Sequence, residues 1–456
     1  MKRHGQRFIE FILRPFTRRF LKAGLQKCVR RLLEFVGRRP IILLDNHVYA
    51  LYFLNIDYNR VIIEGLKRGV PIIFHRVWPT LDGAQGDGLV EDLYQCYRGV
   101  RLFDAVEYSL CISLEIARHE FNPANDKHVA EARRWLAYAK AVVDEMISLF
   151  ERKRPRAVVF MQGYYVEAVV ARQLASTYGV QLLAMERTFH TERIICEPVS
   201  GISVNKNSAM AWFHRFQGEA GGAKEAPWEI MARIDSEKHA GHASPQTEYQ
   251  WPAARRRILF LGQCFTDSSV LFGVHGAYST VEIVRELVHY AVASGSHLFI
   301  KLHPQEKCGG TTFKTPYNKL TRRRLDQAGF PFGVQPGECA AVYHLDEDNE
   351  FSTQALMKTA DVVVTINSQG GFEAQAFGRE VVLCGEAFYD RLGTTWNVPH
   401  PVLLAPTLDA IMVAGLRKAN MDLYSAFMHI YFERYCIGQN PKDLTDGLIK
   451  RSRRIG

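Results

Sequence analysis

Short β-rich runs alternate with longer helical patterns along most of this chain, and the alternation occurs twice. It runs from residue 40 to about residue 215 and starts again after residue 254. Between these stretches, residues 217–254 lose hydrophobic periodicity and gain Gly, Ala and Pro, which is typical of a linker. Because alternating strands and helices form parallel sheets covered by helices, the pattern predicts two α/β domains.

Eight runs have the composition of strands: 41–44, 70–74, 157–161, 181–184, 257–261, 297–302, 360–366 and 380–384. The longest helical pattern covers 128–152. Two βα domains of similar size resemble the twin-Rossmann arrangement of GT-B glycosyltransferases, in which the domains face a cleft. The predicted boundaries are an arm at 1–39, a first domain at 40–216, the linker, and a second domain with C-terminal helices at 255–456.

The charge of the chain is concentrated in its first segment. The 456 residues carry a net charge of +9, but residues 1–39 alone hold 12 Lys and Arg and two acidic residues, a net of +10. The remainder, with 57 − 12 = 45 basic and 48 − 2 = 46 acidic residues, is nearly neutral. A neutral body argues against a nucleic-acid partner.

In the arm, two apolar stripes face basic residues and predict short amphipathic helices. A basic helix with an aromatic face is typical of an interfacial membrane anchor, here through Arg14, Arg18 and Arg19. The alternative is that the stripe packs on the protein body. No window reaches the 18 or so apolar residues of a membrane span, and the nine cysteines are scattered, as in a reducing cytoplasm. We therefore expect a cytoplasmic protein, peripheral on the inner face of the cytoplasmic membrane.

Residues 360–389 hold the most informative motif. A buried strand is followed by the polar turn Asn367-Ser368-Gln369-Gly370-Gly371 and then by a helix. Ligands of open α/β sheets bind beyond the carboxyl ends of strands, and helix N-termini favour anions. Ser368 could donate to a phosphate and Glu373 could bind ribose hydroxyls. The plain alternative is a strand-turn-helix in which Ser368 only caps the helix.

Two further motifs follow strands of the same domain. His303-Pro304 ends one strand, and its imidazole could donate to a phosphate or protonate a leaving group. Gln263 and Asp267 follow another strand, where Asp267 either caps a helix or presents a carboxylate to the interdomain cleft. Because strands of one parallel sheet share an edge, we expect the three motifs to lie close together.

These motifs, in their order and spacing, resemble the bacterial capsule polysaccharide biosynthesis family, which contains retaining β-Kdo transferases (Kdo, 3-deoxy-manno-octulosonic acid). The segments 158–165 and 183–189 of the first domain resemble it as well. The likeness covers roughly 155–395. A departure is Arg379-Glu380, where the family has a Lys-Pro-like pair, and the chain holds one catalytic module where some members carry two.

The resemblance implies a GT-B enzyme that transfers Kdo from CMP-Kdo to a glycolipid or oligosaccharide acceptor. It implies Asp267 as the nucleophile of a double displacement, which carboxylate chemistry permits, and His303 beside the departing phosphate. The remaining nucleotide-binding candidates are Gln263, Ser368, Gln369, Gly370, Gly371 and Glu373. No metal or other cofactor is expected, because His303 and helix dipoles can offset the charge of one phosphate.

The first domain is expected to receive the acceptor. Its candidates lie near predicted strand ends: Gln162, Tyr164, Glu186, His190 and Arg193. Either Glu186 or His190 could be the base for the acceptor hydroxyl. Two alternatives stay open, namely a GT-B transferase with another CMP- or UDP-sugar, and a non-catalytic peripheral membrane subunit of a capsule assembly complex.

Overall fold

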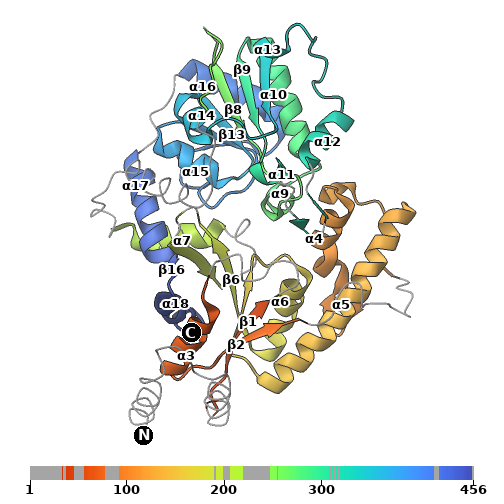
Figure 1. Ribbon diagram of the computed structural model, residues 1–456, viewed down its shortest axis with the longest axis vertical. Helices are drawn as coiled ribbons and strands as arrows, with labels where there is room; N and C mark the ends of the chain where they lie inside the picture. Colours follow the sequence, from red (N-terminus) through yellow and green to blue (C-terminus); the bar gives the residue numbers. More distant parts are fainter. Residues whose placement is uncertain are drawn as a thin grey trace. The chain divides into compact units, whose positions relative to one another are not determined.

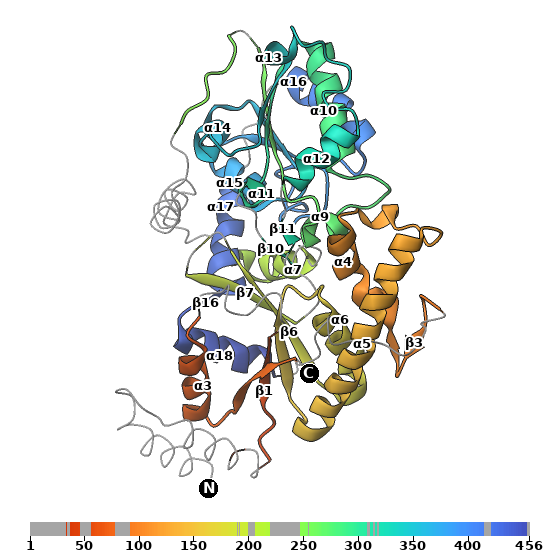
Figure 2. The ribbon, with the colours of Figure 1, turned by 45° about the vertical axis from the view of Figure 1, so that its right-hand side comes forward.

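The computed structural model describes residues 33, 37–45, 56–77, 92–188, 190, 192–198, 206–218, 247–253, 255–307, 311–312, 315–316, 319–414 and 421–453. They form two compact units, each with its own six-stranded sheet (Figures 1 and 2). Unit 1 comprises Met1–Leu110, Ala124–Ile202 and Cys436–Gly456, and unit 2 comprises Cys111–Pro123 and Ser203–Tyr435.

The sheet of unit 2 is entirely parallel. Its strands are β8 (Arg257–Leu261), β9 (His297–Lys301), β12 (Tyr343–Asp346), β13 (Val362–Thr365), β14 (Glu380–Leu383) and β15 (Trp396–Asn397). They lie in the order β12-β9-β8-β13-β14-β15. The chain therefore winds outward from β8 in one direction and from β13 in the other, as in a Rossmann fold. Ligands of such sheets bind at this switch point, beyond the carboxyl ends of the two central strands.

Helices cover both faces of this sheet. The helices of unit 2 are α7 (Lys206–Phe216), α9 (Ser268–Gly273), α10 (Thr280–Ser294), α11 (Pro304–Lys307), α12 (Leu320–Gln327), α13 (Cys339–Val342), α14 (Thr353–Thr359), α15 (Gln369–Ala376), α16 (Leu404–Ala414), α17 (Met421–Ile430) and the π-helical turn Tyr431–Tyr435. The short hairpin β10 (Thr311–Thr312) and β11 (Thr315–Pro316) completes the unit. Helices α10 and α16 share one core cluster with the strands, and α15 packs on β13 and β14.

Unit 1 has a mixed sheet. Its strands are β1 (Ile41–Asp45), β2 (Ile72–Arg76), β5 (Ala157–Met161), β6 (Gln181–Arg187), β7 (Arg193–Glu197) and β16 (Ile437–Gly438), in the order β16-β7-β6-β5-β1-β2. Strands β2, β1, β5 and β6 are parallel, whereas β7 and β16 are antiparallel to their neighbours. The parallel part has its own switch point between β1 and β5.

The helices of unit 1 are α3 (Tyr58–Lys67), α5 (Asp126–Lys153), α6 (Val166–Tyr178) and α18 (Pro441–Arg451), with the first turns of α4 (Leu102–Leu114). The hairpin β3 (Cys96–Tyr97) and β4 (Val100–Arg101) lies near α6. Helices α3 and α18 lie side by side (Figure 1) and bury Val61, Leu444 and Leu448 against the strands. The last helix of the chain thus packs in unit 1, whose sheet contains the first strands of the sequence.

The fold class predicted from the sequence is confirmed: the chain folds into two Rossmann-like α/β units. Strands predicted at 157–161 and 257–261 have the predicted bounds, and α5 extends the predicted helix by a few residues. The sequence pattern missed the strands β7, β12, β15 and β16. β12 is mostly half-buried, and β15 and β16 are two residues long. β7 is largely buried, but its apolar run is only three residues between Arg193 and Glu197.

The structure differs from the predicted division of the chain at two places. The predicted second domain included the C-terminal segment, but its described residues 436–453 belong to unit 1, and residues 111–123 of the predicted first domain belong to unit 2. In the latter segment, Glu115 pairs with Arg323 at 2.9 Å and Glu120 pairs with Arg324. Most of the predicted linker, 219–246, and nearly all of the arm, with Arg14, Arg18 and Arg19, lie outside the described residues.

Candidate functional site

Three loops of unit 2 leave the carboxyl ends of adjacent strands and place the predicted residues at one edge of the sheet. Gln263 and Asp267 follow β8, His303 follows β9, and Ser368 follows β13. Because β8 lies between β9 and β13, the loop after β8 is the central one. The predicted proximity of the three motifs is therefore present at the switch point of this sheet.

Gln263 and Asn367 tie the loop after β8 to the loop after β13. The Gln263 amide donates to Asn367 Oδ1 at 2.9 Å and accepts from the Asn367 backbone N–H at 3.1 Å. The Asn367 amide in turn donates to the Ser269 carbonyl at 2.6 Å. Both side chains are buried. The structure thus gives Gln263 a role that sequence reasoning had not assigned, and Asn367, whose polar type at a strand end was its only signal, is the partner it missed.

Asp267 is the N-cap residue of α9, as the plain alternative predicted. Its Oδ1 accepts from the Ser269 backbone N–H at 2.8 Å. Its second oxygen, Oδ2, has no hydrogen-bond partner among the residues the structure describes, and the side chain is half-buried. Capping by one oxygen fixes the carboxylate and leaves the other oxygen for a ligand or a reacting atom. The two roles weighed for Asp267 are therefore compatible.

His303 lies against the loop after β8. Its Nδ1 accepts from the Gln305 backbone N–H at 3.2 Å and lies 3.4 Å from Cys264 Sγ. With Nδ1 as acceptor, the neutral ring carries its proton on Nε2, which can donate to an anion. Burial lowers the pKa of His303 below its ordinary value, while the negative charge of Asp267 acts in the opposite direction. The pKa of His303 therefore depends on the negative charge of Asp267, and protonation of Asp267 would lower it.

The turn before α15 is a capped helix N-terminus. Ser368 Oγ accepts from the Gly370 backbone N–H at 3.1 Å, and the Ser368 carbonyl accepts from Gly371 N–H at 3.1 Å. The buried Tyr389 hydroxyl also donates to that carbonyl, at 2.6 Å. The two glycine amides therefore already have acceptors within the turn, and a phosphate would have to compete for them. The Ser368 hydroxyl retains its own proton for donation.

The neighbours of this turn are side chains of α15. Gln369 opens the helix in a half-buried position, and Glu373 follows one turn later, also half-buried. The negative charge of Glu373 contributes, after burial, to the raised pKa values of Tyr389 and Tyr424. Glu373 thus lies near two buried tyrosines of unit 2. Whether it binds ribose stays a prediction.

A buried ion pair lies at the same edge of the sheet, at the ends of β9 and β12. The sequence analysis did not identify it. Lys301, at the end of β9, donates to Asp346 Oδ2 at 2.7 Å, and both side chains are almost fully buried. Asp346 begins the acidic run 346–348, yet it is the last residue of β12 and also accepts from Glu350 N–H at 2.7 Å. Only the position of Lys301 at a strand end could have signalled the pair.

Glu306 is a second buried carboxylate of this edge. It accepts from the backbone N–H of Phe265 at 3.3 Å and of Thr321 at 2.9 Å, and so links the loop after β8 to α12. Burial raises the pKa of Glu306, and the hydrogen bonds of Thr321 oppose that rise. The loops after β8 and β9 are thereby fixed to the body of unit 2.

In unit 1, Gln162 and Tyr164 follow β5, at the carboxyl end of the sheet. Gln162 adopts a left-handed backbone conformation with φ 62°, which is uncommon for a residue other than glycine. Its Oε1 is buried and has no hydrogen-bond partner among the described residues, and such orphaned oxygens are rare in native structures. Tyr164 is buried and packs on Tyr108 with ring centroids 6.0 Å apart. Because Tyr164 is buried against an aromatic ring, its position fits a packing role better than contact with an acceptor.

The other predicted residues of unit 1 lie around the end of β6 and the start of β7. Glu186 is half-buried in β6. His190 is buried, and its Nδ1 accepts from Glu192 N–H at 3.2 Å, which leaves the proton of the neutral ring on Nε2. A ring in that state donates a proton at Nε2, so Glu186 is the better candidate for a base.

Arg193, the first residue of β7, lines a polar cavity of about 500 Å³ at this edge. The other lining residues are Ile56, Asp57, Arg60, Glu192, Gly438, Gln439, Asn440, Pro441 and Asp443. They come from the starts of α3 and α18 and from β16. Arg193 thus joins a cavity that the distant C-terminal segment completes.

Metal ligation and membrane crossing each depend on the chemistry of the described side chains and helices. No group of three or more His, Cys, Asp or Glu side chains within them is arranged to hold a metal ion. No helix in the described part of the chain has both the length and the apolar character needed to cross a membrane.

The sequence of unit 2 matches a known family. Residues 214–437 match the family described as "Capsule polysaccharide biosynthesis protein". The "Lipopolysaccharide-processing protein LpsZ" of Rhizobium meliloti is 26% identical over 188 residues. That match covers 41% of this chain and 35% of LpsZ, so the chain spans about a third of the length of this relative.

Solved structures of low sequence identity are also similar. "Thermosulfurimonas dismutans KpsC, beta Kdo 2,4 transferase" is 19% identical, with a TM-score of 0.42 over 67% of this chain and 94% of that one. The "beta Kdo 2,7 transferase" of the same KpsC is 16% identical, with a TM-score of 0.37 over 67% and 89% of the two chains. The family match covers nearly all of unit 2 and every candidate residue of its switch point. Residues 214–437 therefore resemble the capsule polysaccharide biosynthesis family, which is the resemblance that the motifs indicated.

Proposed function

We propose that this protein is a glycosyltransferase of capsule or surface polysaccharide biosynthesis that transfers Kdo from CMP-Kdo, with retention, to a glycolipid or oligosaccharide acceptor. The observation that carries the proposal is the convergence of Asp267, His303 and Ser368 at the switch point of a Rossmann-like sheet. This is the place where sheets of this order bind nucleotides. The family match and the names of the related KpsC transferases support the choice of chemistry.

The proposed reaction is a double displacement. The free Oδ2 of Asp267 attacks the anomeric carbon of Kdo, the bond from that carbon to the phosphate oxygen breaks, and CMP leaves with the electron pair. His303 Nε2–H and the Ser368 hydroxyl donate to the departing phosphate and stabilise its charge. Glu373 and Gln369 hold the nucleotide, and Gln263 acts by fixing the loops.

In the second step, the acceptor hydroxyl loses its proton to Glu186 and attacks the same carbon, and the Asp267 carboxylate leaves. Two inversions restore the original configuration. We place the acceptor at the carboxyl edge of the sheet of unit 1, where Arg193 lines the polar cavity and Gln162 presents a buried oxygen in need of a donor. The proposal requires neither a metal ion nor another cofactor.

The nucleotide is tested by thermal stabilisation with CMP, UMP, UDP and GDP. A nucleotide at 100 times its Kd should stabilise the folded protein by about 2.7 kcal/mol. We expect stabilisation by CMP that is lost in Glu373→Ala. Stabilisation by UDP or GDP alone would retain a transferase with another donor, and no stabilisation at all would favour a non-catalytic subunit.

The nucleophile is tested with Asp267→Asn. Asn is as good an N-cap as Asp, so this variant keeps the start of α9 and removes only the nucleophilic carboxylate. We expect unchanged stability and CMP binding, with transfer from CMP-Kdo reduced by several orders of magnitude. Full transfer activity in Asp267→Asn would eliminate the double displacement.

A further inference from the structure

A large basic cavity lies at the opposite edge of the unit 1 sheet from the acceptor candidates. Its volume is about 870 Å³. It is lined by Gly37, Arg38, Arg39, Pro40, Phe150, Glu151, Arg152, Lys153, Arg154, Thr177 and Tyr178. These residues precede β1 and lie at the C-terminal ends of α5 and α6, so the cavity lies at the amino ends of the strands.

The lining carries a strong positive charge. Five cationic side chains and one carboxylate, Glu151, give a net charge of 5 − 1 = +4. Basic residues in the last turn of a helix are favoured by its dipole, which is equivalent to about half a charge. That effect accounts for Arg152 and Lys153 at the end of α5, but not for Arg38 and Arg39, which belong to another segment.

Further cations crowd the same edge. Arg156, the residue before β5, has a pKa lowered first by burial and then by the positive charges of Arg453, Arg38 and Arg39. Like charges held this close repel one another, and a bound anion would relieve the repulsion. The fold tolerates this arrangement of cations, although it carries an electrostatic cost in the absence of an anion.

Hydrogen bonds from one side chain to backbone carbonyls hold the frame of the cavity together. The Arg39 guanidinium donates to the carbonyls of Arg154 at 3.0 Å, Pro155 at 2.7 Å and Gly179 at 3.2 Å. One side chain thereby joins the three segments that enter β1, β5 and β6. Arg38, Arg152 and Arg154 are exposed around this frame. The cations are thus presented by a fixed scaffold.

The cavity also continues the basic arm of the sequence. Gly37 lines it, and the 36 residues that precede Gly37 hold ten Lys and Arg and only two acidic residues. We propose that the cavity binds the phosphate-bearing headgroups of anionic lipids and so docks unit 1 on a membrane surface by its amino edge. This site is independent of the donor site and of the transfer chemistry proposed above.

The experiment measures flotation of the full-length chain with vesicles of phosphatidylcholine, with and without phosphatidylglycerol. The test variant is Arg38→Glu/Arg152→Glu/Arg154→Glu, and the matched control is Lys127→Glu/Arg133→Glu/Arg134→Glu at the other end of α5. Both change the charge by the same amount, and all six side chains are exposed. The 36 residues that precede Gly37 are unchanged in both variants.

Each basic residue near an anionic surface contributes about 1 kcal/mol. We therefore expect at least a tenfold weaker partition for the test variant and about threefold or less for the control, only on vesicles with phosphatidylglycerol. An equal loss in both variants, or no loss in either, would overturn the proposal. If the test variant unfolds in a thermal melt, the single variant Arg38→Glu replaces it, with an expected loss of about fivefold.

A second measurement separates lipid headgroups from soluble phosphate. Inorganic phosphate is titrated against the thermal stability of the wild-type protein and of the test variant. Stabilisation by phosphate without partition onto vesicles would assign the cavity to a soluble anion and overturn the membrane assignment. If the wild-type protein binds the vesicles and the test variant does not, the result supports the membrane assignment, even where phosphate competes weakly.

Discussion

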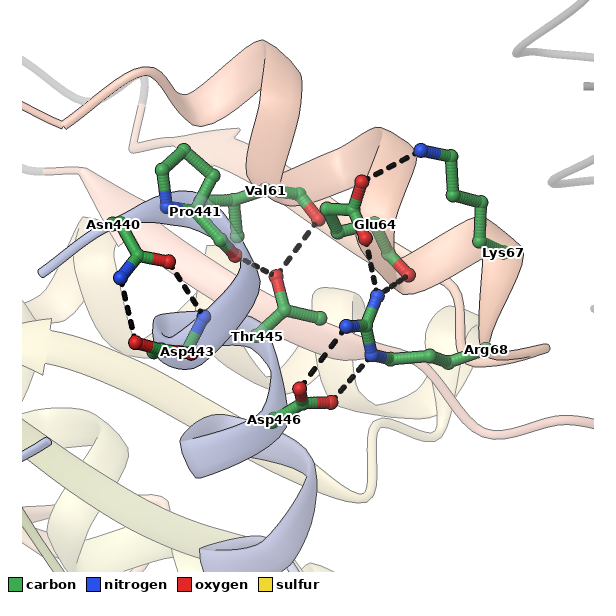
Figure 3. A network of polar contacts seen from close by, with 9 residues as sticks. All are labelled: Val61, Glu64, Lys67, Arg68, Asn440, Pro441, Asp443, Thr445 and Asp446. Carbon is green, nitrogen blue, oxygen red and sulfur yellow. Dashed lines mark hydrogen bonds and ion pairs between the residues drawn. The ribbon is translucent and has the colours of Figure 1, made fainter. Parts of the chain in front are cut away.

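The Lys301–Asp346 pair of unit 2 and the Arg68–Asp446 pair of unit 1 each join elements far apart in sequence, and they differ in burial. In unit 2, Lys301 and Asp346 have 3% and 1% of their side chains exposed. In unit 1, Arg68, the C-cap residue of α3, and Asp446 of α18 pair at 2.5 Å, with 22% and 52% of their side chains exposed (Figure 3). Charges in the interior lose their hydration and depend on each other, whereas exposed charges retain water as a substitute partner.

The surroundings of the two pairs extend this contrast. Asp346 accepts two backbone N–H groups besides the Lys301 ammonium, so a single carboxylate organises the ends of β9 and β12. Around Asp446, apolar packing between α3 and α18 supplies the main contact, and Arg68 also pairs with Glu64 on its own helix (Figure 3). Unit 2 thus fixes its site edge with buried polar contacts, while unit 1 fixes its last helix by apolar packing with a polar rim.

The largest effect is expected for Asp346→Ala. Removal of one partner of a buried pair leaves an uncompensated charge, here the Lys301 ammonium, and costs about 3–5 kcal/mol. Chemical denaturation should show this loss, and hydrogen exchange should place it in peptides of β9 and β12 and leave those of β5 unchanged. The double variant Lys301→Met/Asp346→Leu serves as control, because it removes both charges and should recover much of the stability.

An intermediate effect is expected for Asn367→Ala. The substitution leaves the buried Gln263 amide without the Asn367 Oδ1 acceptor and the Ser269 carbonyl without the Asn367 amide donor. It should cost about 1–3 kcal/mol. It should also weaken CMP binding, because the loops after β8 and β13 keep the backbone hydrogen bond to Gln263 but lose both side-chain hydrogen bonds of Asn367. Asn440→Ala, which removes an exposed amide that caps α18 in unit 1, is the control for CMP binding. Equal CMP affinity in Asn367→Ala and wild type would break the link between the buried contacts and the site.

Much of this architecture follows from local sequence. Central strands such as β8 and β13 are continuous apolar runs. Polar residues in the loops that follow them, such as Asp267 and Ser368, lie at the carboxyl edge of a parallel sheet. The capping roles of both residues were also readable, since Asp and Ser are preferred N-caps.

The rest depends on contacts between distant segments. Nothing near Asp446 in the sequence indicates that α18 pairs with α3 in the first unit, and nothing near Glu115 indicates its partner Arg323. Asp346 looks like a loop residue because acidic neighbours follow it; its burial is decided by Lys301 on the adjacent strand. The cap of Ser368 also engages the glycine amides that the sequence offered to a phosphate.

A smaller effect concerns pH. Burial lowers the pKa of His297, whose Nδ1–H donates to the Ala341 carbonyl at 3.0 Å while Nε2 accepts from Tyr249 at 2.9 Å. The folded state therefore prefers the neutral ring, and the unfolded state takes up the proton first as pH falls below about 6.5. The free energy of unfolding of unit 2 should decrease through that window, by about 1.4 kcal/mol per unit of pKa difference.

Denaturation at pH 7.5 and 5.5, for wild type and His297→Asn, measures this contribution. The variant should lose part of the pH dependence, although His303 and His344, whose pKa values burial also lowers, retain the remainder. The raised pKa of Glu306 has the opposite effect: protonation of this carboxyl favours the folded state as the pH falls towards 4.5. Measurements at lower pH would therefore mix the contribution of Glu306 with that of His297. Identical pH profiles for the two proteins would exclude His297 as a source.

The smallest effect is expected for Asp446→Ala, and it decides whether burial is the cause of the contrast. The Arg68 guanidinium keeps Glu64 as a partner and gains water, so the loss should be about 0.2–1 kcal/mol and should shrink in high salt. Helix α18 should stay docked through Leu444 and Leu448, and its hydrogen exchange should be unchanged. A loss as large as that of Asp346→Ala would mean that the exposed pair carries the docking of α18, and exposure would no longer account for the difference between the units. If Asp446→Ala lowers the free energy of unfolding only within the expected range, and Asp346→Ala lowers it by several kcal/mol, the difference is due to desolvation. Both substitutions replace an aspartate by alanine, so the chemical change is the same.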